Sequence, residues 1–166
     1  MSDLFQEKVE SDWIDQIVAV MSMSPQHIFQ VLTKRPERML EYVRQGQWHI
    51  AVMAAHASKE LGDLYLDPAK KAGVTSEERF ARLGAEQGPL AHRIVQGGFG
   101  AALPNVWLGV SVEDQPTADE RIPLLLQTPA AVRWVSAEPL LGPINLTAWL
   151  PPSSPALNWV VTGGES

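Results

Sequence analysis

Six polar side chains stand at the ends of short apolar runs in this sequence, where they could act together on a ligand. The runs cover residues 27–34, 106–113, 132–138 and 159–166. The side chains are Lys34, Ser111, Glu113, Ser136, Glu138 and Glu165. A carboxylate suits an ammonium partner, a lysine suits a carboxylate or phosphate, and a serine hydroxyl beside a carboxylate can bind a ribose or an amine. The set therefore favours binding of a polar small molecule.

The runs themselves are rich in β-branched and aromatic residues. Near-continuous runs of this length are typical of strands buried on both faces, as in a parallel sheet covered by helices. In parallel α/β folds, ligands bind at the carboxyl ends of the strands. We therefore expect the six polar residues to gather on one rim of the sheet, and we expect function to lie there.

Helical patterns separate the runs. Apolar residues recur at helical spacing after Ser11, and Pro36 suits the first turn of a second helix. The segment Thr117-Ala118-Asp119-Glu120 matches a capping box for a third helix, in which Pro123 predicts a kink or a later start. From about residue 47 to residue 104 the strand pattern gives way to a helical insertion. The sequence thus predicts a single α/β domain over residues 1–166.

Composition narrows the classes of protein to which the chain can belong. The 166 residues are 45% hydrophobic, which suffices for one core, and the formal net charge of -6 disfavours a nucleic-acid partner. The chain has no cysteine, which excludes disulfides and cysteine-held iron–sulfur clusters within it. No apolar stretch approaches the roughly 20 residues of a membrane span. We expect a soluble, cytoplasmic protein with no membrane partner.

Six motifs in this chain resemble one known group of proteins. The motifs are Met1-Ser2-Asp3-Leu4-Phe5, Val31-Leu32-Thr33-Lys34-Arg35-Pro36-Glu37-Arg38-Met39, Trp107-Leu108-Gly109-Val110-Ser111-Val112-Glu113-Asp114-Gln115, Ala118-Asp119-Glu120-Arg121, Ser136-Ala137-Glu138-Pro139-Leu140-Leu141-Gly142 and Gly163-Gly164-Glu165-Ser166. Together they are similar to a family of uncharacterised, phage-associated proteins of unknown function that look like radical S-adenosylmethionine barrel enzymes. The resemblance covers essentially the whole chain outside the insertion.

The resemblance implies a partial (β/α) TIM-like barrel with mostly parallel strands and a cysteine loop that binds an iron–sulfur cluster. This chain departs from that pattern because it has no cysteine, and both of its ends look cut from something larger. We therefore expect a truncated core that does not cleave S-adenosylmethionine by itself. S-adenosylmethionine remains a candidate ligand, and the cluster is expected only in full-length relatives.

Individual rim residues have alternative explanations. Glu138, followed by Pro139, resembles the strand end that holds the methionine amino group in radical enzymes, but it could instead cap a helix or pair with Arg133 or Arg121. Ser111 and Glu113 are two residues apart, so on a strand they would share one face. Alternatively, Glu113 and the residue after it would only begin the loop before the next helix.

Basic residues and glycines extend the candidate site. Lys34 is the best candidate for an anion, whereas Arg35 and Arg38 could equally pair with carboxylates on the helix that follows. Gly163 and Gly164 could let backbone amides approach a ligand. His49, His56 and Glu60 have helical spacing, but such spacing often arises by chance, so the sequence predicts no metal site. The six tryptophans are better explained as core and interface residues.

Two classes of function follow. In the first, the chain is an incomplete radical-enzyme-like barrel that keeps part of a pocket for a small or nucleotide-like molecule. In the second, it is a non-catalytic α/β binding or assembly module whose exposed sheet edges pair with another copy, giving a homo-oligomer. The sequence identifies no substrate or reaction for either class.

Overall fold

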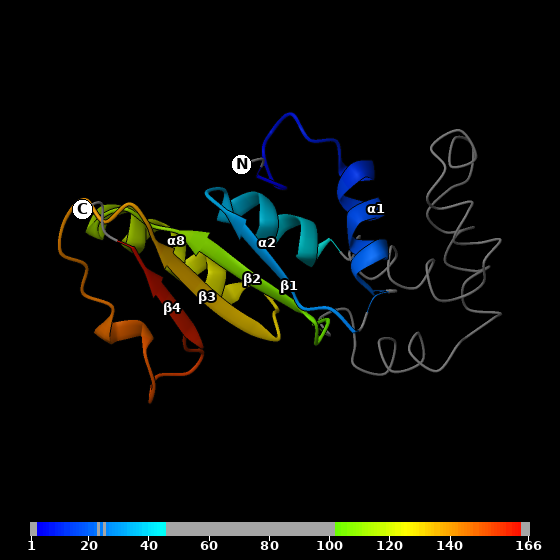
Figure 1. Ribbon diagram of the computed structural model, residues 1–166. Helices are drawn as coiled ribbons and strands as arrows, with labels where there is room; N and C mark the ends of the chain where they lie inside the picture. Colours follow the sequence, from blue (N-terminus) through cyan, green and yellow to red (C-terminus); the bar gives the residue numbers. More distant parts are fainter. Residues whose placement is uncertain (1–2, 23, 25, 46–101, 164–166) are drawn as a thin grey trace, which may run out of the picture. The chain divides into compact units, whose positions relative to one another are not determined.

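A computed structural model of the chain contains one parallel sheet of four strands in the order β1-β2-β3-β4 (Figure 1). The structure describes residues 3–22, 24, 26–45 and 102–163. The strands are β1 (Phe29–Thr33), β2 (Val106–Ser111), β3 (Val132–Ala137) and β4 (Trp159–Thr162). All four lie within the apolar runs, and the parallel α/β class predicted from those runs is confirmed. Because neighbouring strands are parallel, their carboxyl ends meet at one rim of the sheet.

The register divides the strand residues between two faces of the sheet. Val31, Leu108 and Arg133 lie level with one another, and side chains alternate between the faces along each strand. On the face that we call the buried face, Val106, Leu108, Val110, Val112 and Val135 are at most 1% exposed. Helix α8 (Gln115–Gln127) packs against β2 and β3 and buries its own Ala118, Ile122 and Leu125 completely. These apolar residues are the core of the sheet.

The opposite face, which we call the pocket face, carries a row formed by Leu32, Gly109, Trp134 and Trp159. The ring of Trp134 lies directly over Gly109, where a Cβ atom would come within 2.5 Å of the ring atom Cε2. Trp159 contacts Trp134 and Trp107, with ring centroids 5.5 and 5.9 Å away. This tryptophan cluster covers the pocket face on the amino-terminal side of its polar residues, and Gly109 provides the space for it.

The start of α8 differs from the sequence prediction. The capping box consists of Asp114, whose side chain accepts a hydrogen bond from the Thr117 backbone, and of Thr117, whose hydroxyl accepts one from the Asp114 backbone. Thr117 is therefore the third residue of the helix rather than its cap, because the Asp114 carboxylate accepts the hydrogen bond of a free amide in the first turn. Pro123 lies inside the helix on an exposed turn, so the predicted later start is wrong.

Two further helices precede β2 in the part of the chain that the structure describes. Helix α1 covers Ser11–Ser22 and helix α2 covers Pro36–Arg44, in agreement with the predicted positions. The chain divides into two compact units, one made of Met1–Lys8, Ile28–Glu41 and Ala102–Ser166, the other of Val9–His27 and Tyr42–Ala101. The sheet and its rim belong wholly to the first unit. The insertion predicted at about 47–104 lies almost entirely outside the described residues.

The edges of the sheet are less covered than the sequence suggested. Among the described residues, β1 pairs only with β2 and β4 only with β3, so the sheet is open and forms no closed barrel. The expectation that every strand is buried on both faces is wrong for β4, in which Trp159 and Thr162 are exposed. No described helix connects β3 to β4, only a loop with a short 3-10 turn at Thr147–Trp149. None of the described helices has the length and apolar character of a bilayer span.

Candidate functional site

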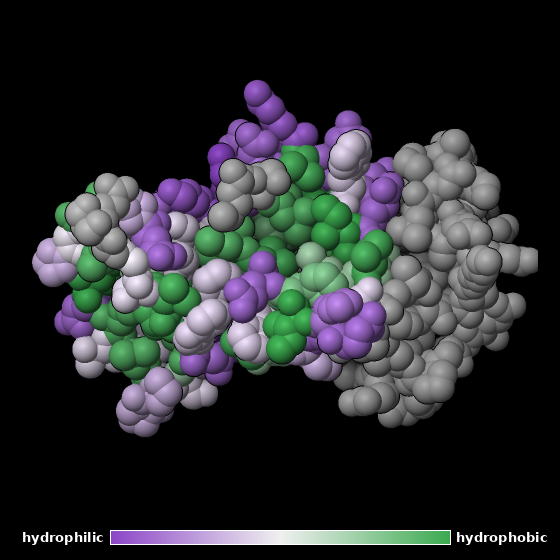
Figure 2. All heavy atoms as spheres, viewed as in Figure 1, coloured by the Kyte–Doolittle hydropathy of each residue, from purple (hydrophilic) through white to green (hydrophobic). Residues whose placement is uncertain are grey.

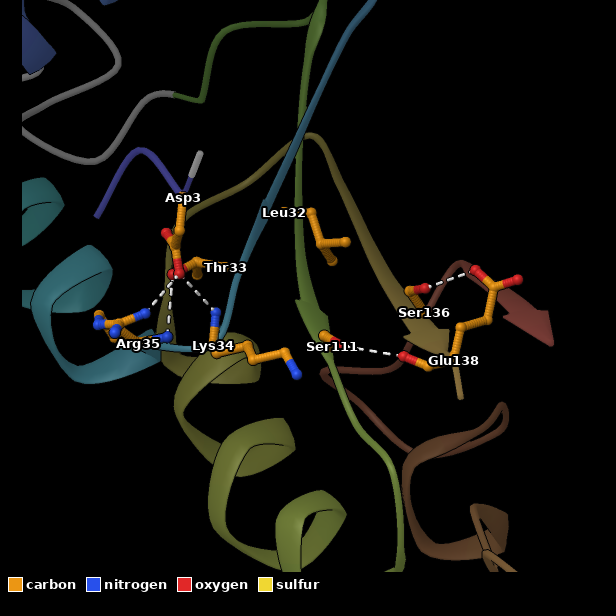
Figure 3. A pocket seen from close by; sticks show the side chains of 8 residues that line it. All are labelled: Asp3, Leu32, Thr33, Lys34, Arg35, Ser111, Ser136 and Glu138. Atoms are coloured by element: carbon orange, nitrogen blue, oxygen red, sulfur yellow. Dashed lines mark hydrogen bonds and ion pairs between the residues drawn. The ribbon is translucent and has the colours of Figure 1, made fainter. Parts of the chain in front are cut away.

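The carboxyl ends of β1, β2 and β3 surround a pocket of about 400 Å³, which we call the rim pocket (Figure 3). It is lined by Asp3, Leu32, Thr33, Lys34, Arg35, Ser111, Ser136 and Glu138. Leu32, Ser111 and Ser136 project from the pocket face because they occupy alternate positions of register-matched strands. Lys34, Arg35 and Glu138 come from the loops that follow β1 and β3, as the location of ligand sites in parallel α/β proteins would predict, whereas Asp3 comes from the segment before α1.

Asp3 and Arg35 form the first charged group of the rim pocket. The Asp3 carboxylate accepts hydrogen bonds from the Arg35 guanidinium at 3.0 Å, from the Lys34 backbone amide at 3.0 Å and from the Phe5 amide at 2.9 Å. Burial raises the pKa of Asp3, but these hydrogen bonds and one from the Thr33 side chain outweigh it, so the pKa lies below its usual value of 3.8. The charge of Asp3 is therefore matched by Arg35.

Glu113 joins the ends of β1 and β2 to α8. One carboxylate oxygen pairs with Lys34 Nζ, and the other accepts from Arg121 Nη1 at 3.1 Å. Arg121 also donates to the carbonyl oxygen of Ser111 at 2.7 Å. Burial raises the pKa of Glu113, but the hydrogen bond from Lys34 and the charges of Arg121 and Lys34 lower it below its usual value of 4.5. Two cations therefore share one carboxylate, which leaves this group with a net positive charge.

Glu138 lies on the opposite side of the rim pocket, just beyond β3 (Figure 3). Its oxygen Oε2 accepts a hydrogen bond from the Ser136 hydroxyl at 2.9 Å, and the Ser111 hydroxyl lies 3.4 Å from its backbone carbonyl oxygen. Within the part of the chain that the structure describes, no lysine, arginine or histidine pairs with this carboxylate. The alternative in which Glu138 pairs with Arg133 or Arg121 is not found, since Arg121 pairs with Glu113 and Arg133 donates to the carbonyl oxygen of Thr128.

The rim pocket thus separates charge between its two sides. The group of Lys34, Glu113 and Arg121 carries one excess positive charge, which the nearby Asp114 carboxylate partly offsets at Arg121. Glu138 carries one negative charge that no cation of the described residues pairs with. Ser111 lies between them, with its hydroxyl 3.3 Å from Glu113 Oε1. A small molecule with a cationic and an anionic end would match this arrangement.

A comparison with protein families classifies this chain. Residues 1–166 match the family described as "Protein of unknown function (DUF5131)". The chain belongs to this family. Comparison with curated proteins and with solved structures gave no match. The DUF5131 match covers the sheet, the rim pocket and every motif quoted above, so the site lies within the matched domain.

The structure of this DUF5131 chain brings together most of the residues that the sequence pointed to. Lys34, Ser111, Ser136 and Glu138 line one pocket, and Glu113 contacts two of its walls through Lys34 and Ser111. Glu113 is thus a bridging residue at the start of the loop before α8. Gly163 lies against the Glu138 side chain. Gly164 and Glu165 lie outside the described residues.

Sequence reasoning missed Asp3 and Arg121 as members of the site. Asp3 lies 31 residues before Lys34 and stands in the sequence only within the motif Met1-Ser2-Asp3-Leu4-Phe5, whereas its carboxylate in fact holds the loop after β1. The sequence suggests Arg121 only as a motif residue and as a partner for Glu138. The position of Arg121, one helical turn after Thr117, could have revealed its role, since a residue there lies on the side of α8 that faces the end of β2.

The same chain offers no set of metal ligands in its described part. No group of three or more histidine, aspartate or glutamate side chains there could hold a metal ion, and His49, His56 and Glu60 lie outside the described residues. The iron–sulfur cluster that the resemblance implies is held by cysteine thiolates, and this sequence has none. The residues of this chain therefore do not fit such a cluster.

Proposed function

We propose that this DUF5131 chain is a radical-S-adenosylmethionine-like, phage-associated domain of partial (β/α) barrel type, which uses its rim pocket to bind a zwitterionic small molecule. S-adenosylmethionine is the candidate ligand. The observation that carries the proposal is Glu138, a carboxylate that lines the pocket, accepts a hydrogen bond from Ser136 and has no cationic partner among the described residues. A ligand ammonium group would supply the missing partner.

The positive group on the other side of the rim pocket supports the same ligand class. Lys34 has a side chain that is 53% exposed and shares Glu113 with Arg121, so a ligand carboxylate could bind Lys34 without leaving Glu113 unpaired. The apolar side chain of Leu32 lines the space between the charged ends. The strand order also supports the proposal. Strands that follow one another in the chain are parallel neighbours in this sheet, as they are in a (β/α) barrel.

Glu138→Gln is expected to weaken S-adenosylmethionine binding by about tenfold or more, because a hydrogen bond to a charged group contributes about 1.5–3 kcal/mol. Calorimetric titration of the purified chain measures the dissociation constant, and a thermal-shift titration reports the same binding through stabilisation of the folded state. The free energy of unfolding should change by less than about 0.5 kcal/mol, because Glu138 is exposed.

Glu120→Gln is the matched control, since Glu120 is an exposed carboxylate on α8 outside the pocket. It should bind S-adenosylmethionine as the unmodified chain does. The proposal is wrong if the unmodified chain shows no saturable binding at millimolar ligand. It is equally wrong if Glu138→Gln lowers stability and leaves the affinity unchanged, since Glu138 would then have a structural role.

A second function, an assembly module, is favoured by the free edge of β4. This strand pairs only with β3 among the described residues, and Trp159 beside the edge is 40% exposed. Figure 2 shows hydrophobic surface on the side of the sheet where β4 lies. An unpaired strand edge with exposed apolar side chains is a template for pairing with a second copy.

This second proposal predicts a dimer that a charge on the edge disrupts. Light scattering coupled to size exclusion should give a mass that rises toward twice 18.2 kDa as the chain concentration increases. Thr162→Lys, at an exposed position of β4, should return the mass to that of the monomer. A monomer mass for the unmodified chain at every concentration would reject assembly through this edge and leave the rim pocket proposal unaffected.

A further inference from the structure

Gly163 lies immediately after β4, beside Glu138, which lies immediately after the neighbouring strand β3. Ala137 pairs with Thr162 in the parallel register, so the residues that follow them stand side by side. A Cβ atom built on Gly163 would lie 2.1 Å from Glu138 Oε1, 2.9 Å from Cδ and 3.1 Å from Cγ. The end of the Glu138 side chain therefore occupies the space that any other residue at position 163 would fill.

Ser136 and Gly163 contact different oxygens of the Glu138 carboxylate, so together they restrict its movement. Oxygen Oε2 accepts the Ser136 hydroxyl hydrogen bond, and Oε1 rests against the bare backbone of Gly163. An exposed glutamate otherwise moves among many rotamers, and fixing such a side chain on binding costs conformational entropy. Contacts on both sides orient the carboxylate before the ligand arrives.

We infer that Gly163 is a positioning residue of the rim pocket, which holds the Glu138 carboxylate in its ligand-binding orientation because it has no side chain. The inference rests on the proposed function, because the orientation of Glu138 matters for binding only if the rim pocket holds a ligand. It also makes β4 a part of the site, although no β4 side chain lines the pocket. Any larger residue at position 163 displaces Glu138 and breaks its hydrogen bond with Ser136.

A positioning role of Gly163 can be told from a structural one by measuring both ligand affinity and melting temperature. The atoms that a new Cβ would meet are the far end of a flexible side chain, so Glu138 can swing away at little cost to folding. Gly163→Ala should therefore weaken S-adenosylmethionine binding by about tenfold and leave the melting temperature nearly unchanged. A purely structural glycine would show the opposite pattern, a lower melting temperature with the affinity retained.

Gly142→Ala is the matched control, because no atom lies within 4 Å of the Cβ that it would add. It should bind S-adenosylmethionine as the unmodified chain does. In a Glu138→Ala background, Gly163→Ala should cause no further loss of affinity, since the side chain that it displaces is already absent. A further tenfold loss in that background, or an equal loss in Gly142→Ala, would overturn the inference.

Crystal structures of the unmodified chain and of Gly163→Ala separate this inference from the proposed function. If the unmodified chain does not bind S-adenosylmethionine, the proposed function fails, and the position of Glu138 then decides the role of Gly163. Displacement of the Glu138 carboxylate and loss of the Ser136 hydrogen bond in Gly163→Ala would support the role. A Glu138 side chain that keeps its place in the variant would overturn it.

Discussion

Gly109→Ala is expected to lower the free energy of unfolding by roughly 3 kcal/mol, at the upper end of the usual range for overpacking. Without other contacts, alanine in the middle of a strand would be more stable than glycine by about 0.5–1 kcal/mol. Here the added Cβ would lie 2.5–2.7 Å from three atoms of the Trp134 ring, which is 6% exposed and cannot easily move. The clash with Trp134 therefore decides the sign of the effect.

Chemical denaturation of Gly109→Ala and of the control Gly142→Ala measures this effect. The control should differ from the unmodified chain by less than about 0.5 kcal/mol, because its new methyl group meets nothing within 4 Å. Trp134→Leu should recover part of the loss when it is combined with Gly109→Ala, since the smaller side chain removes the clash. Equal stability of Gly109→Ala and the unmodified chain would show that the tryptophan cluster rearranges freely.

Glu113→Gln is expected to lower the free energy of unfolding by about 2 kcal/mol at pH 7, which is the usual contribution of hydrogen bonds to charged groups. The amide keeps the size of the side chain but leaves Lys34 and Arg121 without their shared carboxylate. The side chains of Glu113 and Arg121 are only 12% and 15% exposed, so water replaces this interaction poorly. Without the Glu113 carboxylate, Arg121 keeps its hydrogen bond to the Ser111 carbonyl oxygen, and its Nε has no acceptor among the described residues that could compensate.

The loss should depend on pH in a defined direction. Because the pKa of Glu113 in the folded chain lies below the usual 4.5, its carboxylate stabilises the fold above that value. This stabilisation disappears as the pH falls through the folded pKa, so the difference between Glu113→Gln and the unmodified chain should shrink below about pH 4.5. Urea denaturation at pH 7 and at pH 3 measures it, with Glu120→Gln as control. A difference that is the same at both values would contradict a role for the ionised carboxylate.

The sequence predicted the sheet well because its signal is local. β-branched and aromatic runs marked all four strands, and their polar ends correctly indicated that Lys34, Ser111, Ser136 and Glu138 would come together. That conclusion needed only the rule that parallel strands end at the same rim. It did not require knowledge of the register or of the neighbours of any side chain.

The rest of the site depends on contacts between residues far apart in the chain. Asp3 reaches Arg35 across 32 positions, and Gly163 lies beside Glu138 only through the register of β3 and β4. Neither contact leaves a periodic pattern in the sequence. The burial of β4 was overestimated for a related reason, since an apolar run does not reveal whether another element covers it.

Among the described residues β4 pairs with β3 alone, so the ligand binding that we propose for the rim pocket depends on how firmly this strand is held. Strands with one partner open locally at a lower free energy than strands in the middle of a sheet. Each opening of β4 would remove Gly163 from beside Glu138 and release the carboxylate, so the binding-competent population is the population in which this strand is closed. The apparent dissociation constant then equals the intrinsic one divided by that closed fraction. An edge strand would thus regulate the affinity that we propose for a pocket that it does not line.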